Sequence, residues 1–192
     1  RNCDWSSDVC SSDLPEGCYG TSGSTVYVPE EQTCAVKAIN GANSSAGYQT
    51  ILIRRQATMD LRDSNLFLAN ETETITLING RIINSSSTPY GIDGSSRSGD
   101  LALNLTDNSR IRIASFQGGS GRESILVDAS SSFEIASVAL NQGDDSFRND
   151  GQSHVGTLNF GSGNDRLEQY GTFKADNAVE MGPGNDIIIT NG

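Results

Sequence analysis

The sequence has few aromatic residues, little proline and no long hydrophobic run. Aromatic residues make up 6% of the 192 residues, and there are only 4 prolines, a single Trp and a single His. No apolar run is long enough to cross a bilayer as a helix, and no segment has convincing helical periodicity of its apolar residues. These absences argue against a globular α/β enzyme and against a helical membrane protein.

Positive charge is also scarce. The chain has 13 Lys and Arg residues against 24 Asp and Glu residues, which gives a formal net charge of −11. An acidic surface disfavours binding to nucleic acid and to anionic membranes. Phosphate-binding loops, zinc-ligand spacings and dinucleotide fingerprints are absent from the sequence. We therefore expect no nucleic-acid partner.

The feature that is present is a repeat of 20–22 residues in the C-terminal half. Three copies that begin with Gly-Asn/Asp-Asp and end with Gly align at 143–151, 163–171 and 184–192. Their leading glycines are 20 and 21 residues apart, and a degraded register continues backwards to Gly121 and Gly99. Repeats with periods of this length are typical of solenoid proteins.

Each repeat combines short β-rich runs with Gly, Asn and Asp, which is about one coil of a parallel β-helix. Glycine supplies positive φ at the corners, and Asn and Asp bond to the nearby backbone. One coil cannot bury its apolar side alone, so coils must stack, about 4.8 Å apart. We therefore predict an all-β, parallel β-helix fold with about 20–22 residues per coil and roughly eight coils. The inward-facing candidates are Ile111, Ile113, Phe133, Ile135, Leu158, Phe173, Val179 and Met181.

The first half of the chain is less regular. Strand-like runs occur at 25–28, 35–39, 50–53, 66–68 and 74–78, without a clean period. We expect one domain over 15–192, with irregular coils at 15–98 and regular repeats at 99–192. Cys18 and Cys34 could form a disulfide that staples the N-terminal end, and the alternative is two reduced, buried cysteines.

The N-terminal segment is excluded from this domain. Residues 4–14 read DWSSDVCSSDL, which resembles the translation of a common sequencing-adapter DNA and includes the single Trp, Trp5. We therefore expect residues 1–14 to be a disordered artefact. Because the native start is then absent and Gly192 falls on a repeat position, we expect the chain to be truncated at both ends.

The repeat also carries a family resemblance. GSGNDRLEQYGTF (161–173) and VEMGPGNDIIITNG (179–192) resemble the repeats of bacterial autotransporter passenger domains, well over 138–192 and loosely over 99–137. The resemblance implies a right-handed β-helix that is secreted or displayed on the bacterial cell surface. It also implies a downstream outer-membrane β-barrel in the same polypeptide, which this chain does not include. The expected function is structural or adhesin-like, with a host or cell-surface ligand.

A second reading of the repeat involves calcium. GSGNDRLEQ (161–169) is similar to the nonapeptide of calcium-binding β-rolls. Calcium prefers carboxylate and carbonyl oxygens, so stacked Asp145, Asp165 and Asp186 are candidate metal contacts. However, the motif occurs once per coil, whereas a β-roll repeats it every nine residues. Turn geometry with local Asp–backbone bonds is the alternative role for these aspartates.

A third reading is a polysaccharide-acting β-helix enzyme. Such an enzyme needs paired carboxylates, and the sequence offers Asp144 with Asp145, or Asp60 with Asp63. Neither pair is accompanied by a distinguishing motif, and we expect the single histidine, His154, to be a solvated turn residue. We therefore predict no catalytic residues and no cofactor, with calcium as the only candidate ion.

Overall fold

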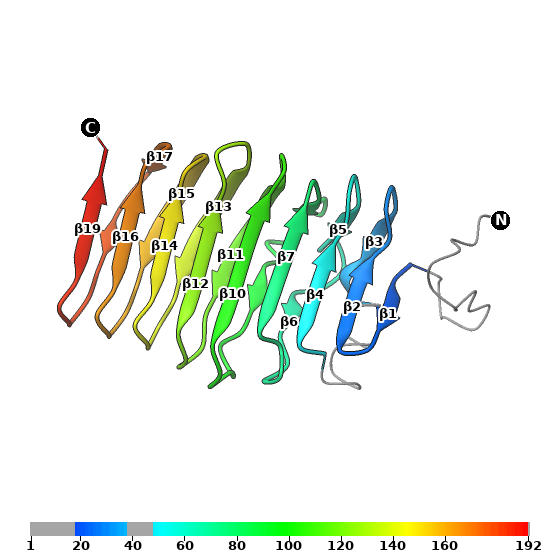
Figure 1. The fold of residues 1–192 in the computed structure, drawn as a ribbon, viewed down its shortest axis with the longest axis horizontal. Helices are drawn as coiled ribbons and strands as arrows, with labels where there is room; N and C mark the ends of the chain where they lie inside the picture. The colour runs from blue at the N-terminus through cyan, green and yellow to red at the C-terminus, as the bar shows by residue number, and fades with distance from the viewer. Residues whose placement is uncertain (1–17, 38–47, 192) are drawn as a thin grey trace.

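The coils of the chain contribute strands to two long sheets, and in the ribbon one sheet lies behind the other along the same axis (Figure 1). The structure, a computed structural model, describes residues 18–37 and 48–191. They form an all-β parallel β-solenoid of about 7 turns with roughly 22 residues per turn, which confirms the predicted fold class. The predicted artefact at 1–14 and the last residue lie outside the described residues.

The strands of the described residues form two sheets. The first has nine strands in the order β1 (Gly20–Ser22), β2 (Thr25–Val28), β4 (Thr50–Ile53), β7 (Thr74–Ile78), β10 (Leu101–Thr106), β12 (Glu123–Val127), β14 (Ser146–Asn149), β16 (Arg166–Gln169) and β19 (Ile187–Thr190). The second contains β3 (Thr33–Ala35), β5 (Thr58–Asp60), β8 (Arg81–Ile83), β11 (Arg110–Gln117), β13 (Ser132–Ala139), β15 (Gln152–Asn159) and β17 (Thr172–Ala175). To it are added β6 (Leu66–Phe67), β9 (Ile92–Asp93) and β18 (Val179–Glu180). Pairs between coils are parallel, and β1 caps the first sheet by pairing antiparallel with β2.

The strand register explains why the first half has no clean period. Thr25 pairs with Thr50 and Thr50 with Thr74, so these coils contain 25 and 24 residues. Thr74 then pairs with Ala102, which makes a coil of 28 residues. Later coils contain 22, 22, 20 and 21 residues. Because the early coils are longer than the C-terminal repeat, the chain makes about seven turns and not the predicted eight.

Alternation of apolar and polar residues places the core between the two sheets. Strand β10 alternates buried and half-buried positions along its length, as expected when one strand face is packed and the other is solvated. Ile125, Phe147 and Leu167 occupy one stacked position and are buried, whereas Ile188 of the last coil is 55% exposed. The predicted inward residues are buried, except for Phe173, Val179 and Met181, which are half-buried against the core.

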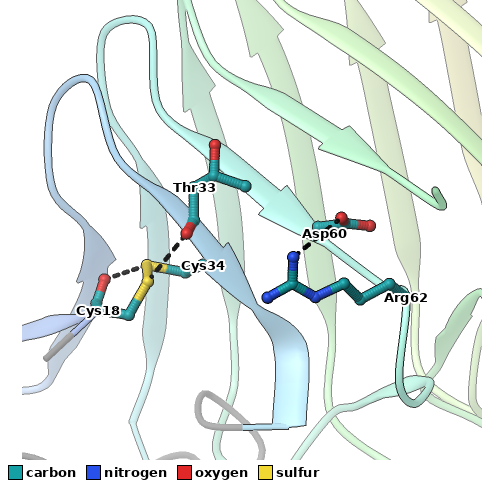
Figure 2. Close-up of a disulfide and its surroundings, with 5 residues drawn as sticks. All are labelled: Cys18, Thr33, Cys34, Asp60 and Arg62. Carbon is teal, nitrogen blue, oxygen red and sulfur yellow. Dashed lines mark hydrogen bonds and ion pairs between the residues drawn. A yellow bond between two sulfur atoms is a disulfide. The ribbon is translucent and has the colours of Figure 1, made fainter. Parts of the chain in front are cut away.

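A disulfide closes the N-terminal end of the core (Figure 2). It joins Cys18 to Cys34 of β3, with a Cα–Cα distance of 5.3 Å. The sulfur atoms lie against the carbonyl oxygens of Thr33 and Cys18, and Cys34 is fully buried. The disulfide therefore ties the segment just before β1 to β3, the first strand of the second sheet.

Candidate functional site

The Gly-Asn/Asp-Asp corners stack on one another just before strands β14, β16 and β19. A Cβ atom on Gly163 would lie 1.7 Å from the carbonyl oxygen of Gly143, and both glycines have positive φ (153° and 127°). Any side chain there would push neighbouring coils apart and would also strain the backbone. Glycine at this corner is therefore required for the spacing between coils.

The second residue of the motif reaches toward the following coil, and we call these side chains the outward column. The Asp144 carboxylate accepts the backbone N–H of Asn164 at 2.7 Å, and the Asn164 side-chain oxygen accepts that of Asn185 at 3.1 Å. Asp100 accepts the N–H of Arg122 in the same way, at 3.0 Å. The outward column therefore joins neighbouring coils through side-chain-to-backbone bonds.

The third residue reaches in the opposite direction, toward the preceding coil. Asp145 accepts the backbone N–H of Glu123 at 2.7 Å, Asp165 accepts that of Asp145 at 2.8 Å, and Asp186 accepts that of Asp165 at 3.0 Å. The structure thus brings the three predicted aspartates together in one stack. Glu123 extends the stack by one coil, and we call these four residues the inward column.

Sequence reasoning missed Glu123 as a member of this column. In the sequence, the copy at 121–123 departs from the repeat motif because Arg-Glu replaces Asn/Asp-Asp. The available signal was the 22-residue spacing between Gly121 and Gly143, which places Glu123 in the position of Asp145. A longer acidic side chain occupies the same place in the stack, so the acidic character was the informative property.

Burial sets the electrostatics of the inward column. Glu123, Asp145 and Asp165 expose 1% or less of their surface. Burial, with the charges of Glu123 and Asp165, raises the pKa of Asp145 to about 8. Burial also raises the pKa of Glu123 to about 6 and raises that of Asp165. Removing water disfavours a charged carboxylate, and like charges nearby add to that effect.

One buried cation lies near the N-terminal end of the column. The Arg97 guanidinium is 2% exposed and donates to the carbonyl oxygens of Ala69 at 2.6 Å, Asp100 at 2.8 Å and Gly99 at 3.2 Å. Burial lowers the pKa of Arg97, and the negative charge of Glu123 opposes that shift. The guanidinium therefore both fastens this part of the chain and balances one negative charge in the core.

Hydrogen bonds between coils already use part of the oxygen atoms that the inward column could offer to calcium. Calcium takes six to eight oxygen ligands, but one oxygen of each of Asp145, Asp165 and Asp186 already accepts a backbone N–H. In the part of the chain that the structure describes, no group of three or more acidic, His or Cys side chains is placed to hold a metal ion. The geometry instead gives these residues the role of joining coils.

The candidate carboxylate pairs are also separated. Asp144 is exposed in the outward column, whereas Asp145 points into the core. Asp60 is buried and accepts the N–H and hydroxyl of Ser85 at 3.1 and 2.6 Å, whereas Asp63 is exposed and accepts the N–H of Lys37 at 3.3 Å. Neither pair presents two carboxylates to a common space.

A polar groove crosses strands β11, β13 and β15 of the second sheet. It has a volume of about 330 Å³, and Arg112, Glu134, His154 and Asp176 line it together with Ala136 and Gly156. His154 lies within β15, so its predicted place in a turn is wrong. The Nε2 atom of His154 is 2.9 Å from the Asp176 carboxylate. The guanidinium of Arg112 is 3.4 Å from the carboxylate of Glu134. The groove therefore holds paired charges of both signs.

Comparison with protein-family models, curated proteins and solved structures finds no match for this chain. Among the described residues, no helix has the length and apolar character needed to cross a membrane. The candidate functional features of the molecule are the two corner columns, the disulfide and the polar groove.

Proposed function

We propose that this chain is a fragment of a secreted or surface-displayed autotransporter passenger, in which the solenoid is a structural, adhesin-like module without catalytic activity. The inward column is the observation that carries the proposal. The acidic side chains of the repeat are used to join coils, so they do not face a substrate. Such a repeat produces a long stack of coils whose outward strand positions can vary without disturbing the core.

The polar groove is the interaction surface in this proposal. The side chains of Arg112 and Glu134 are 66% and 41% exposed and pair at 3.4 Å. Exposed ion pairs of this kind contribute only about 0–1 kcal/mol to stability. Exchanging them for contacts with a partner therefore costs the fold little. The mixed charges fit a polar host or cell-surface ligand.

Two features support export. The Cys18–Cys34 disulfide is of a kind that persists in oxidising compartments, which include the periplasm and the cell exterior. The repeat at 161–173 also resembles those of autotransporter passengers. In a polypeptide of that kind, the partner of this module is the outer-membrane β-barrel that follows it.

Bead adhesion tests the adhesive function. Beads coated with the purified chain are incubated with cultured host cells, and Arg112→Ala is compared with Arg148→Ala. Arg148 is a matched control because its side chain is 52% exposed and it belongs to β14 of the other sheet. We expect adhesion above that of albumin-coated beads, reduced by Arg112→Ala only. Adhesion no greater than with albumin would reject the function, and equal loss in both variants would reject the groove as its site.

The groove also supports a polysaccharide-acting enzyme as a second candidate. His154 Nε2 lies 2.9 Å from Asp176 and 3.2 Å from the Lys174 Nζ atom, and Glu134 lines the same groove. Acid–base cleavage requires a base and an acid within reach of one substrate. Release of reducing ends from polysaccharides, abolished by His154→Ala but not by Arg148→Ala, would replace the adhesive proposal with this one.

A further inference from the structure

Among the described residues, three buried carboxyl oxygens have no hydrogen-bond partner: Oδ2 of Asp165, and a pair in neighbouring coils, Oε2 of Glu123 and Oδ2 of Asp145. The other oxygens of both side chains are satisfied. Oε1 of Glu123 accepts the N–H of Gly119 at 3.0 Å, and Oδ1 of Asp145 accepts the N–H of Glu123 at 2.7 Å. A buried polar atom without a partner costs about 1–3 kcal/mol. A hydrogen-bond donor is therefore missing from this part of the core.

The two side chains lie opposite each other in the stack. Ser124 pairs with Ser146, which places the preceding residues Glu123 and Asp145 in the same register, and adjacent strands are about 4.8 Å apart. Two negative charges that close repel strongly where water is excluded. A protonated carboxyl group, in contrast, donates a hydrogen bond to a carboxylate. One proton would give both unpaired oxygens a partner.

The surrounding charges favour one negative charge at this place but not two. Arg97 supplies the positive charge that acts on Glu123, and its guanidinium is buried. The other charges that act on the pair are acidic: Asp100, before β10, acts on Glu123, and Asp165, before β16, acts on Asp145. Asp144 and Asp186 act in turn on Asp165. A second ionised carboxylate would therefore have no cation to balance it.

We propose that Glu123 and Asp145 form an internal acid pair that shares one proton, with Asp145 Oδ2–H donating to Glu123 Oε2. This hydrogen bond joins two coils at the start of the regular repeats. Loss of the proton breaks the O–H bond of Asp145, releases H⁺ to solvent and leaves two facing carboxylates in the core. The contact between the coils of Glu123 and Asp145 therefore weakens as the pH rises.

The pKa directions agree with this assignment and fix the pH range. Both acids have pKa values above their ordinary values, about 8 instead of 3.8 for Asp145 and about 6 instead of 4.5 for Glu123. The folded state then binds more protons than the unfolded state, so the stabilisation is complete at low pH and is lost as the pH rises. Glu123 contributes to this loss up to about pH 6, and Asp145 up to about pH 8. For one proton, the unfolding equilibrium constant rises by up to about tenfold per pH unit.

Urea unfolding of the full chain at a series of pH values tests the proposal. We expect the stability of the wild type to fall from about pH 4 upward and to level off above about pH 8. Between about pH 6 and about pH 8 the fall is due to Asp145. In Asp145→Asn the carboxamide is a permanent donor to Glu123, so the fall over this range should disappear. The matched control is Asp144→Asn, which changes the exposed neighbour and should leave the fall intact. A flat wild-type profile, or an equal fall in Asp145→Asn, would overturn the shared proton.

Infrared spectroscopy of the wild type provides a test that needs no variant to fold. In heavy water at neutral pH, we expect the C=O stretch of a protonated carboxyl group, which should vanish above about pH 8. Its absence at neutral pH would contradict the proposal. Recovery of wild-type stability near pH 8 on addition of calcium chloride would also contradict it, because a cation and not a proton would then lie between the two acids.

Discussion

Adding one methyl group at the corner glycine tests how tightly the coils approach each other. In Gly163→Ala the new Cβ would lie 1.7 Å from the Gly143 carbonyl oxygen, at a backbone φ of 153°. The strained backbone costs about 1–3 kcal/mol. Relief of the clash requires the coils of Gly143 and Gly163 to separate, which weakens the bonds from Gly143 N–H to Ser162 (3.0 Å) and from Asp145 N–H to Asp165 (2.8 Å). At about 0.5–1.5 kcal/mol for each bond, the total loss is about 2–6 kcal/mol.

The control for this substitution is Gly23→Ala, measured in the same urea titration. Gly23 also has positive φ, at 57°, but no atom lies within 4 Å of its added Cβ. Its replacement should cost only the left-handed backbone term, about 1–2 kcal/mol. The difference between the two variants isolates the contact between coils. Equal losses would refute the argument that close approach of the backbones requires glycine at the corner.

Two further substitutions probe the core and its N-terminal end. Phe147→Ala should lower the free energy of unfolding in urea by about 3–5 kcal/mol. Phe147 is fully buried and packs edge-to-face on Phe133, with the ring centroids 5.3 Å apart. A loss below about 1 kcal/mol would show that these two rings are not packed as described. Replacing both Cys18 and Cys34 with serine should lower the free energy of unfolding by about 2–4 kcal/mol. A reducing agent should produce the same decrease in the wild type and none in the variant. Insensitivity of the wild type to reduction would contradict the disulfide.

Local sequence patterns were sufficient where strands alternate cleanly. The runs at 25–28, 50–53 and 74–78 coincide with β2, β4 and β7, because alternating β-branched and apolar residues mark a strand with one buried face. The predicted run at 35–39 agrees less well: β3 ends at Ala35, and residues 38–39 lie outside the described residues. Strand ends at corners depend on contacts between coils, which a local pattern does not contain.

The sequence predicted which aspartates stack at the corner, but not toward which neighbouring coil each side chain points. The repeat placed Asp145, Asp165 and Asp186 in one stack, and the structure confirms that stack. Adjacent motif residues, however, send their side chains to opposite neighbouring coils, as Asp144 and Asp145 do. That difference depends on backbone dihedrals at the corner, which residue types alone do not determine. The polar groove was missed because its lining residues come from separate coils and share no sequence motif.

Thermal unfolding at neutral pH, with calcium or with a chelator, is the most direct test of the claim that the Gly-Asn/Asp-Asp corners join coils. If the inward aspartates are bonded to the backbone of the preceding coil, the two melting temperatures should be equal. An ion bound by the folded state only would add about 2.7 kcal/mol at a hundredfold excess over its Kd. A clear rise in melting temperature with calcium, abolished by Asp165→Asn, would contradict the account and make the corner a metal site.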